Sequence, residues 1–361
     1  YVAEHTLSGT RLNSELKNVG AAITELTEEF FQDVGATSMD EVVDYVVNSS
    51  SENGNLSSDD RGNSMLFGPT YKVRGLQGNS LTQDFFISRV GMDMYNSERM
   101  TFSRGPNAVL FGLGNPAGVV NIMTKRARFK NMGKLEFQVD SNDGYRGAFD
   151  YNHVLKDNVL AVRVAGLNSD RRSHFDPAWL KEERIFLTST FKPFTKTNIR
   201  VSYERGVADQ VLARQWPGND AFSDWEAAGS QLYDEAVIWP AKATNALPGT
   251  GMVTSKNLFV RTVLEDGTVV EGFTNNRIRA QTLVTTPTAG KGFHTLTDSS
   301  VIPIETNLSG VNNTADYDFK NATVVLEQEV FKDLHFEFAY NYQDNYREPF
   351  NGIDAKSATL R

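Results

Sequence analysis

Apolar and polar side chains alternate strictly along much of the chain after about residue 129. The longest example lies at 334–343, where one set of alternate positions holds Leu334, Phe336, Phe338, Tyr340 and Tyr342. The positions between them are mostly polar and include His335, Glu337 and Gln343. A period of two places the two sets on opposite faces of a β-strand. The pattern therefore predicts long strands with one apolar face and one face against water or polar protein.

The connections between these strands alternate in length. Short joins are expected at 156–158, 193–198 and 332–333, and long joins at 169–183 and about 209–321. Short turns on one side and long loops on the other are typical of antiparallel transmembrane β-barrels. Counting from Gly133 gives seven strands, whereas large plugged barrels have about 22. The sequence thus predicts an incomplete barrel, with 209–321 as a folded extracellular excursion.

Composition excludes several classes of protein. No run of 18 apolar residues occurs, which excludes a transmembrane helix but not a barrel, because lipid-facing barrel residues alternate with polar ones. The net charge of −9 argues against a nucleic-acid binder with a basic face. The absence of cysteine excludes thiol catalysis and cysteine metal sites. The chain starts without a signal peptide and ends in mid-pattern, so we expect it to be part of a longer protein.

Residues 1–128 lack this long regular alternation, and their pattern instead predicts short strands and two small helices. Thr27 and Gly35 are expected to cap the first helix at its two ends. The sequence Ser38-Met39-Asp40-Glu41 is a capping box for a second helix that extends to about residue 47. Strands are expected at 21–26, 71–75, 85–90 and 95–102. This section is therefore predicted to be a separate α+β domain.

The run at 98–125 carries the most specific information: Glu-Arg-Met-Thr-Phe-Ser-Arg-Gly-Pro-Asn-Ala-Val-Leu-Phe-Gly-Leu-Gly-Asn-Pro-Ala-Gly-Val-Val-Asn-Ile-Met-Thr-Lys. Its glycines permit close backbone approach, and its proline favours a turn, so we predict short strands folded tightly on each other. The order of residues resembles the end of the plug domain of TonB-dependent outer-membrane receptors. Those receptors have an E-R-V-E-V-x-(R/K)-G-P run followed by G-V-(I/V)-N-I-x-T-K. The resemblance covers nearly all of 5–127, with modest departures at 100–103 and at Phe111.

The resemblance implies an α+β plug domain, residues 1–128, inside an antiparallel transmembrane β-barrel whose N-terminal portion is 129–361. It also implies TonB-dependent active import of a scarce nutrient, most often a ferric siderophore, across the outer membrane of a Gram-negative bacterium. The expected partners are TonB, through a segment N-terminal to this chain, the imported small molecule and outer-membrane lipid. No cofactor, resident metal or nucleic acid is implied.

The resemblance further suggests how the plug is held and where it binds its ligand. Arg74 and Arg104 match, by position, plug arginines that pair with barrel glutamates. Inward-facing acids are the expected partners in this chain, namely Glu136, Glu204 and Glu337. The outward plug loops that carry the substrate site in this family correspond to positions that include Arg61, Gly78, Asn79, Ser80, Phe85, Phe86, Met92 and Asp93.

The sequence gives little support for a catalytic function. Residues 112–117 match the dinucleotide fingerprint G-x-G-x-x-(G/A), but a strand-like segment follows where that site needs a helix. The five histidines lack the close spacing of a zinc protease, and no nucleophile elbow occurs. We therefore expect no enzyme. Import of a carbohydrate or other nutrient, a non-transporting signalling or adhesive barrel, and a soluble β-sandwich enzyme stay open as alternatives.

Overall fold

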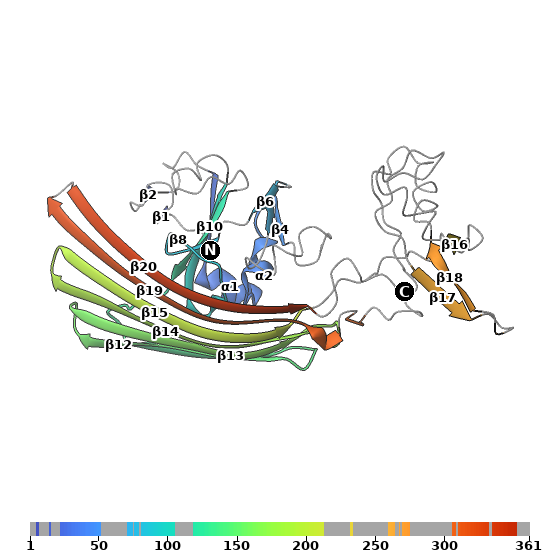
Figure 1. The fold of residues 1–361 in the computed structure, drawn as a ribbon. Coiled ribbons are helices and arrows are strands. Elements are labelled where there is room, and N and C mark those ends of the chain that lie inside the picture. Colours follow the sequence, from blue (N-terminus) through green and yellow to red (C-terminus); the bar gives the residue numbers. More distant parts are fainter. Residues whose placement is uncertain are drawn as a thin grey trace. The chain divides into compact units, whose positions relative to one another are not determined.

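The computed structural model divides the chain into two compact units, Tyr1–Arg214 with Ser309–Gly352 and Gln215–Leu308 with Ile353–Arg361. It describes residues 5–6, 14–15, 22–51, 71–74, 76–78, 81–104, 118–212, 232–233, 259–263, 267, 269–274, 305–307, 310–331 and 334–351. The first unit holds a small α+β domain and a large curved sheet (Figure 1). Within the described part of the chain, no helix is both long and apolar enough to cross a membrane.

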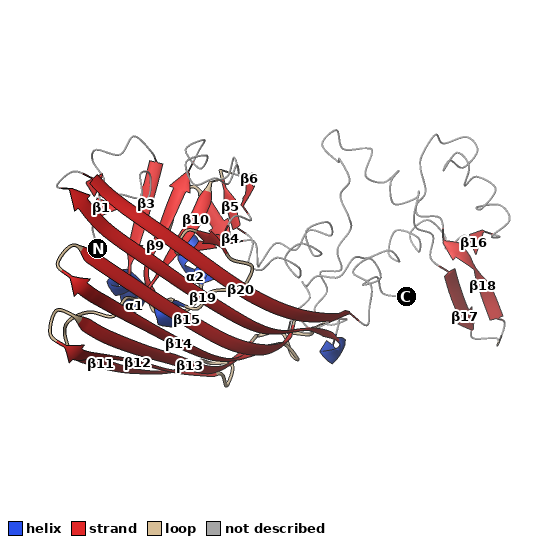
Figure 2. Ribbon diagram, turned by 60° about the vertical axis from the view of Figure 1, so that its left-hand side comes forward, coloured by secondary structure: helices blue, strands red, loops and turns tan. Residues whose placement is uncertain are grey.

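The large sheet has seven strands in sequence order, and every neighbouring pair is antiparallel (Figure 2). The strands are β11 (Met132–Val139), β12 (Tyr145–Lys156), β13 (Leu160–Arg172), β14 (Trp179–Phe194), β15 (Thr197–Val211), β19 (Asn313–Phe331) and β20 (Leu334–Asn351). The predicted count of seven strands and the partial barrel are confirmed. Below, this sheet is called the wall.

The two faces of the wall invert the usual rule of burial. One face presents apolar side chains to the surroundings, and Leu135 is 87% exposed there. The opposite face, called inward because it contacts the α+β domain, buries charges, and Arg163 is only 2% exposed. Such an arrangement is expected where the outer face of a sheet meets lipid. The alternation read from the sequence thus gives the correct faces.

The strands extend beyond the apolar band, which corrects one expectation. The join expected at 169–183 is only 173–178, because β13 continues to Arg172 and β14 begins at Trp179. Alternate outward positions in this part are charged, as at Lys181 and Glu183, so the apolar signal stops before the strand does. Similarly, β15 reaches Val211 and β19 begins at Asn313, which shortens the longest join at both ends.

The second unit is described by a small three-stranded sheet that falls within this longest join. Its strands are β16 (Leu232–Tyr233), β17 (Phe259–Val263) and β18 (Val269–Thr274), in the order β16-β18-β17. One further short helix, η5 (Gly310–Asn312), precedes β19 in the first unit.

The α+β domain, called the plug below, contains a five-stranded sheet in the order β3-β9-β10-β7-β8. These strands are β3 (Ala22–Thr27), β9 (Ser97–Arg104), β10 (Val119–Thr124), β7 (Leu81–Gln83) and β8 (Phe86–Ile87). Smaller sheets pair β1 (His5–Thr6) with β2 (Ser14–Glu15), and join β4 (Ser49–Ser51), β5 (Tyr71–Val73) and β6 (Leu76–Gly78). The helices are α1 (Glu28–Val34), α2 (Met39–Val43) and the 3-10 turn η2 (Met94–Asn96).

The capping signals place both helices correctly. Gly35 ends α1 in the left-handed region, with φ 68°. The capping box of Ser38 and Glu41 starts α2. That helix ends at Val43, four residues before the expected end, and Val47 lies 66% exposed.

The strand expected at 85–90 is present but shorter, as β8 (Phe86–Ile87). The sequence did not indicate that β7 and β8 form a tight hairpin whose turn is Asp84 and Phe85, with φ 48° and 69°. Neither residue is a glycine, so the turn left little signal in the sequence.

The glycine-rich run is described at its two ends. β9 ends at Arg104 and β10 begins at Val119, while 105–117 lie outside the described residues. Gly118 has φ 104°, and a Cβ there would come within 2.2 Å of the Ser103 carbonyl oxygen. The close backbone approach predicted for these glycines is therefore confirmed at Gly118. Because β10 is a strand, the dinucleotide fingerprint lacks the helix that it requires.

Candidate functional site

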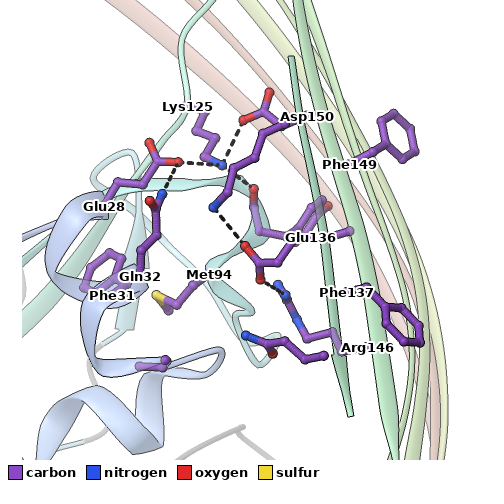
Figure 3. A pocket seen from close by; sticks show the side chains of 16 residues that line it. Glu28, Phe31, Gln32, Met94, Lys125, Glu136, Phe137, Arg146, Phe149 and Asp150 are labelled. Atoms are coloured by element: carbon purple, nitrogen blue, oxygen red, sulfur yellow. Dashed lines mark hydrogen bonds and ion pairs between the residues drawn. The ribbon is translucent and has the colours of Figure 1, made fainter. Parts of the chain in front are cut away.

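The plug meets the inward face of the wall through buried polar and charged side chains. On β12, alternate residues point inward, and Arg146, Asp150 and Asn152 are all buried. The period of two thus aims a charged row at the plug while Phe149 and Tyr151 face outward. These contacts, seen partly in Figure 3, form the candidate site.

The first contact joins a plug acid to a wall arginine. Arg146 donates from Nη2 to Asp93 Oδ1 at 2.7 Å and from Nε to Asp93 Oδ2 at 3.2 Å. Asp93 also accepts a hydrogen bond from the Tyr95 backbone N–H at 2.8 Å, which starts η2. Bidentate pairs of this kind fix geometry as well as charge. Asp93, which the sequence suggested as a ligand contact, is buried against the wall.

The second contact centres on Lys125, at the end of the glycine-rich run. Its ammonium donates to the Tyr95 carbonyl oxygen at 2.8 Å and to Asp150 Oδ2 at 2.9 Å, and it lies 3.1 Å from Glu28 Oε1. Asp150 accepts two further hydrogen bonds, from Nε and Nη2 of Arg163. Figure 3 shows Lys125 between the acid of α1 and the acid of the wall.

The third contact is at Glu204 on β15. Its carboxylate accepts from the Tyr95 hydroxyl at 2.9 Å and from Gln83 Nε2 at 3.0 Å. Burial, together with the nearby Glu204 charge, raises the pKa of the Tyr95 phenol well above its usual value, so it stays a proton donor. Gln83 also accepts from Asn321 on β19 at 2.9 Å.

Beside Glu204, the wall carries a buried cluster of its own. Glu182 accepts hydrogen bonds from Arg184, from Arg171 at 2.8 Å and from the Tyr317 hydroxyl at 3.2 Å. Arg184 Nη1 lies 3.9 Å from Glu204 Oε1, which links the cluster to the plug contact. Each charge of this cluster therefore has an opposite charge beside it, as a low-dielectric site requires.

The structure brings Glu204 to the plug, but to neither predicted arginine. Arg104 donates to the Val47 carbonyl oxygen at 2.9 Å and to Thr24 Oγ1 at 2.7 Å, both within the plug. Arg74 is exposed where β5 ends, with φ 53°.

The two other acids that the sequence suggested as lock partners lie elsewhere on the wall. Glu337 is exposed on β20, and Glu136 on β11 pairs with the wall's own Arg146. The predicted pairing of Arg74 and Arg104 with barrel glutamates is thus not among the described contacts and stays a prediction.

The predicted ligand residues are only partly described. Phe85 and Phe86 are half-buried at the β7–β8 hairpin, Met92 is buried, and Gly78 ends β6. Arg61, Asn79 and Ser80 lie outside the described residues. The sequence reasoning missed Arg146, Asp150, Lys125 and Tyr95. Inward register could have indicated the first two, and the position of Lys125 at the end of the Thr-Lys motif could have indicated the third.

A cavity of about 320 Å³ lies between α1 and the β11–β12 strands. Charges of both signs line it, from Glu28, Lys125, Lys134, Glu136, Arg146 and Asp150 (Figure 3). Among the described residues, no group of three or more acidic or histidine side chains could hold a metal ion. The cavity therefore lies between polar surfaces of the plug and the wall, and its carboxylates form ion pairs with basic side chains.

Several known proteins with similar sequences are receptors for ferric siderophores. The ferrichrome outer membrane transporter/phage receptor of Escherichia coli K12 is 29% identical over 126 residues, covering 34% of this chain and 16% of the relative. The ferrioxamine B receptor of Salmonella typhimurium is 28% identical over 178 residues, covering 46% and 24%. No protein-family model matches the chain. These relatives are transport receptors rather than enzymes.

Solved structures with the same fold are receptors of the same kind. The closed form of the ferric-catecholate import receptor Fiu from E. coli K12 has a TM-score of 0.66 at 15% identity, covering 97% of this chain. The ferric preacinetobactin receptor BauA from Acinetobacter baumannii has a TM-score of 0.64 at 14% identity, covering 96%. The chain spans 40% and 41% of these two proteins. The chain is thus similar in sequence to outer-membrane siderophore receptors, and it has the fold of their plug and of the first part of their barrel.

Proposed function

We propose that the protein to which this chain belongs imports a ferric siderophore across the outer membrane of a Gram-negative bacterium, with energy delivered by TonB. The observation that carries the proposal is a folded plug seated on the charged inward face of a wall whose outward face is apolar. The names of the relatives supply the substrate class, because they are receptors for ferrichrome and ferrioxamine B. In the proposed division, 1–128 is the plug, 129–361 begins the barrel, and the longest join is extracellular.

Import requires that the plug leave the wall. Most of the described contacts that hold it there are polar, beside one small apolar cluster of Tyr95 with Leu167 and Phe186. Water or other polar groups can replace the polar contacts, whereas apolar packing keeps the plug itself folded. TonB, gripping a segment before Tyr1, would pull on the plug. The siderophore would bind outside, on plug loops and barrel loops that include the predicted contacts near Phe85 and Phe86.

The test is growth under iron limitation. Cells that lack their own siderophore receptors would carry the full-length receptor and receive ferrichrome, ferrioxamine B or a ferric catecholate. We expect one ferric complex to restore growth, and the same cells without TonB to gain nothing. Rescue by a carbohydrate alone would support the alternative import function. Binding of a ferric complex without uptake would support the non-transporting barrel.

A further inference from the structure

A wall charge that contacts the plug also has a second partner inside the wall. Arg146 shows this most clearly. It holds Asp93 of the plug through two hydrogen bonds, and it also donates from Nη1 to Glu136 of the neighbouring strand. Asp93 and Arg146 are buried, whereas the Glu136 side chain is 30% exposed. Arg146 therefore bridges a buried plug acid and a half-exposed wall acid.

The other charged contacts repeat the arrangement within the described residues. Asp150 accepts from plug Lys125, and it is also held by Nε and Nη2 of Arg163. Glu204 accepts from two plug side chains and lies 3.9 Å from Arg184 Nη1. In each case the second partner lies on the same strand as the wall charge or on a neighbouring one, so it would stay in place if the plug moved.

The plug carries matching arrangements on its own side. Lys125 lies 3.1 Å from Glu28 and donates to the Tyr95 carbonyl oxygen, both of which belong to the plug. Asp93 would likewise keep the hydrogen bond that it accepts from the Tyr95 backbone N–H, because both residues belong to the plug. If the plug and the wall separated, each of them would therefore retain partners for its own charges.

A charge left unpaired in a poorly hydrated site is costly, and that cost would oppose separation of plug and wall. We propose that the pairs within the wall let the plug leave by taking over each charge that it releases, with Glu136 taking over Arg146 from Asp93. This proposal rests on the import function proposed above, because only a transporter needs the plug to separate repeatedly. Glu136 would then act by holding Arg146 after the plug has separated, which makes it a positioning residue.

The proposal predicts opposite effects for the two acids that share Arg146. Asp93→Asn removes a contact of the seated state and should speed separation. Glu136→Gln should slow separation, because Arg146 would then have Asp93 while the plug is seated and no acid once it has left. A residue that merely supports the interface would loosen the plug when changed. The direction of the Glu136 effect is thus diagnostic.

The measurement is thiol labelling of purified full-length receptor in detergent. Leu167 packs with plug Tyr95 in a buried cluster, so Leu167→Cys places a reporter that the plug covers. The chain has no other cysteine. A polar maleimide would be added at a urea concentration that leaves the barrel folded. Glu183→Gln, at an exposed outward position on β14, makes the same chemical change away from the plug and is the matched control.

We expect labelling about tenfold faster in Asp93→Asn, at least about threefold slower in Glu136→Gln, and unchanged in the control. Labelling of Glu136→Gln at or above the wild-type rate would overturn the proposal, and so would an unchanged rate in Asp93→Asn. Heat-modifiable migration in gels checks that each barrel is folded. The assay uses neither siderophore nor TonB. Failure of the growth test with the expected labelling would therefore reject the import function and leave the pairing arrangement standing.

Discussion

The interior of the plug and its contact with the wall are built from different interactions. Inside the plug, apolar side chains from helices and strands form one core, which includes Phe31, Val42, Val43, Met100, Phe102 and Ile122. Between plug and wall, the main contacts are Asp93 with Arg146, Lys125 with Asp150, and Tyr95 with Glu204. Apolar burial stabilises one compact body, whereas polar pairs can exchange partners. The difference indicates a plug that holds its fold while its attachment changes.

The largest effect is expected from a break in the plug core. Phe102 is 1% exposed and meets Tyr71 edge to face at a ring distance of 6.5 Å. Phe102→Ala should cost about 3–5 kcal/mol through lost burial and a residual cavity. Urea titration of purified receptor, followed by plug proteolysis, measures the loss. A plug as resistant as wild type would show that the core is not what keeps it folded.

A smaller effect is expected from a break at the wall. Asp93→Asn should weaken seating by up to about 3 kcal/mol, less than the cost of a wholly stranded buried charge, because Arg146 keeps Glu136. Cells with this variant should become sensitive to vancomycin, which is too large for ordinary porins. Cells with Glu183→Gln should not. Equal resistance of both variants would place the attachment elsewhere.

The smallest effect is expected from a single hydroxyl. Tyr95→Phe removes the hydrogen bond to Glu204 and should weaken seating by about 1–2 kcal/mol. Glu204 still accepts from Gln83. Slightly faster labelling of the Leu167→Cys reporter would confirm this. A rate equal to that of Asp93→Asn would show that the hydroxyl contributes more than one hydrogen bond.

The contribution of the Tyr95 hydroxyl to stability should depend on pH. The folded pKa of Tyr95 lies well above the usual value, through burial and through Glu204. A raised folded pKa gives stability that is fully present below the unfolded pKa, about 10, and is lost as the pH rises further. The stability difference between wild type and Tyr95→Phe should stay constant up to about pH 9 and shrink above about pH 10. A difference that shrinks near neutrality would contradict the assignment.

The elements that a local pattern specifies were predictable from the sequence. Alternation gave the wall and its two faces, and capping residues gave α1 and α2. The β7–β8 hairpin was missed because its turn uses Asp84 and Phe85 rather than glycine. The end of β13 and the start of β14 were missed because charged residues replace the apolar ones on the outward face there.

The site was harder to predict, because its contacts join residues far apart in the chain. Gln83 and Asn321, which share a hydrogen bond, are 238 positions apart. Inward register showed that Glu204 and Glu136 face the plug, but not which side chains meet them. Asp93 belonged to a loop that the sequence suggested for ligand binding, and only the fold shows its carboxylate paired with Arg146.

The central claim is that import requires separation of plug and wall along these polar contacts. Gln83→Cys with Asn321→Cys would allow a short, cleavable thiol crosslinker to span the interface at an existing contact. Asn168→Cys with Glu183→Cys, a neighbouring pair within the wall, is the matched control. We expect the interface crosslink to abolish uptake of the ferric complex without loss of binding, and we expect cleavage to restore uptake. Uptake at the wild-type rate with that crosslink intact would contradict it.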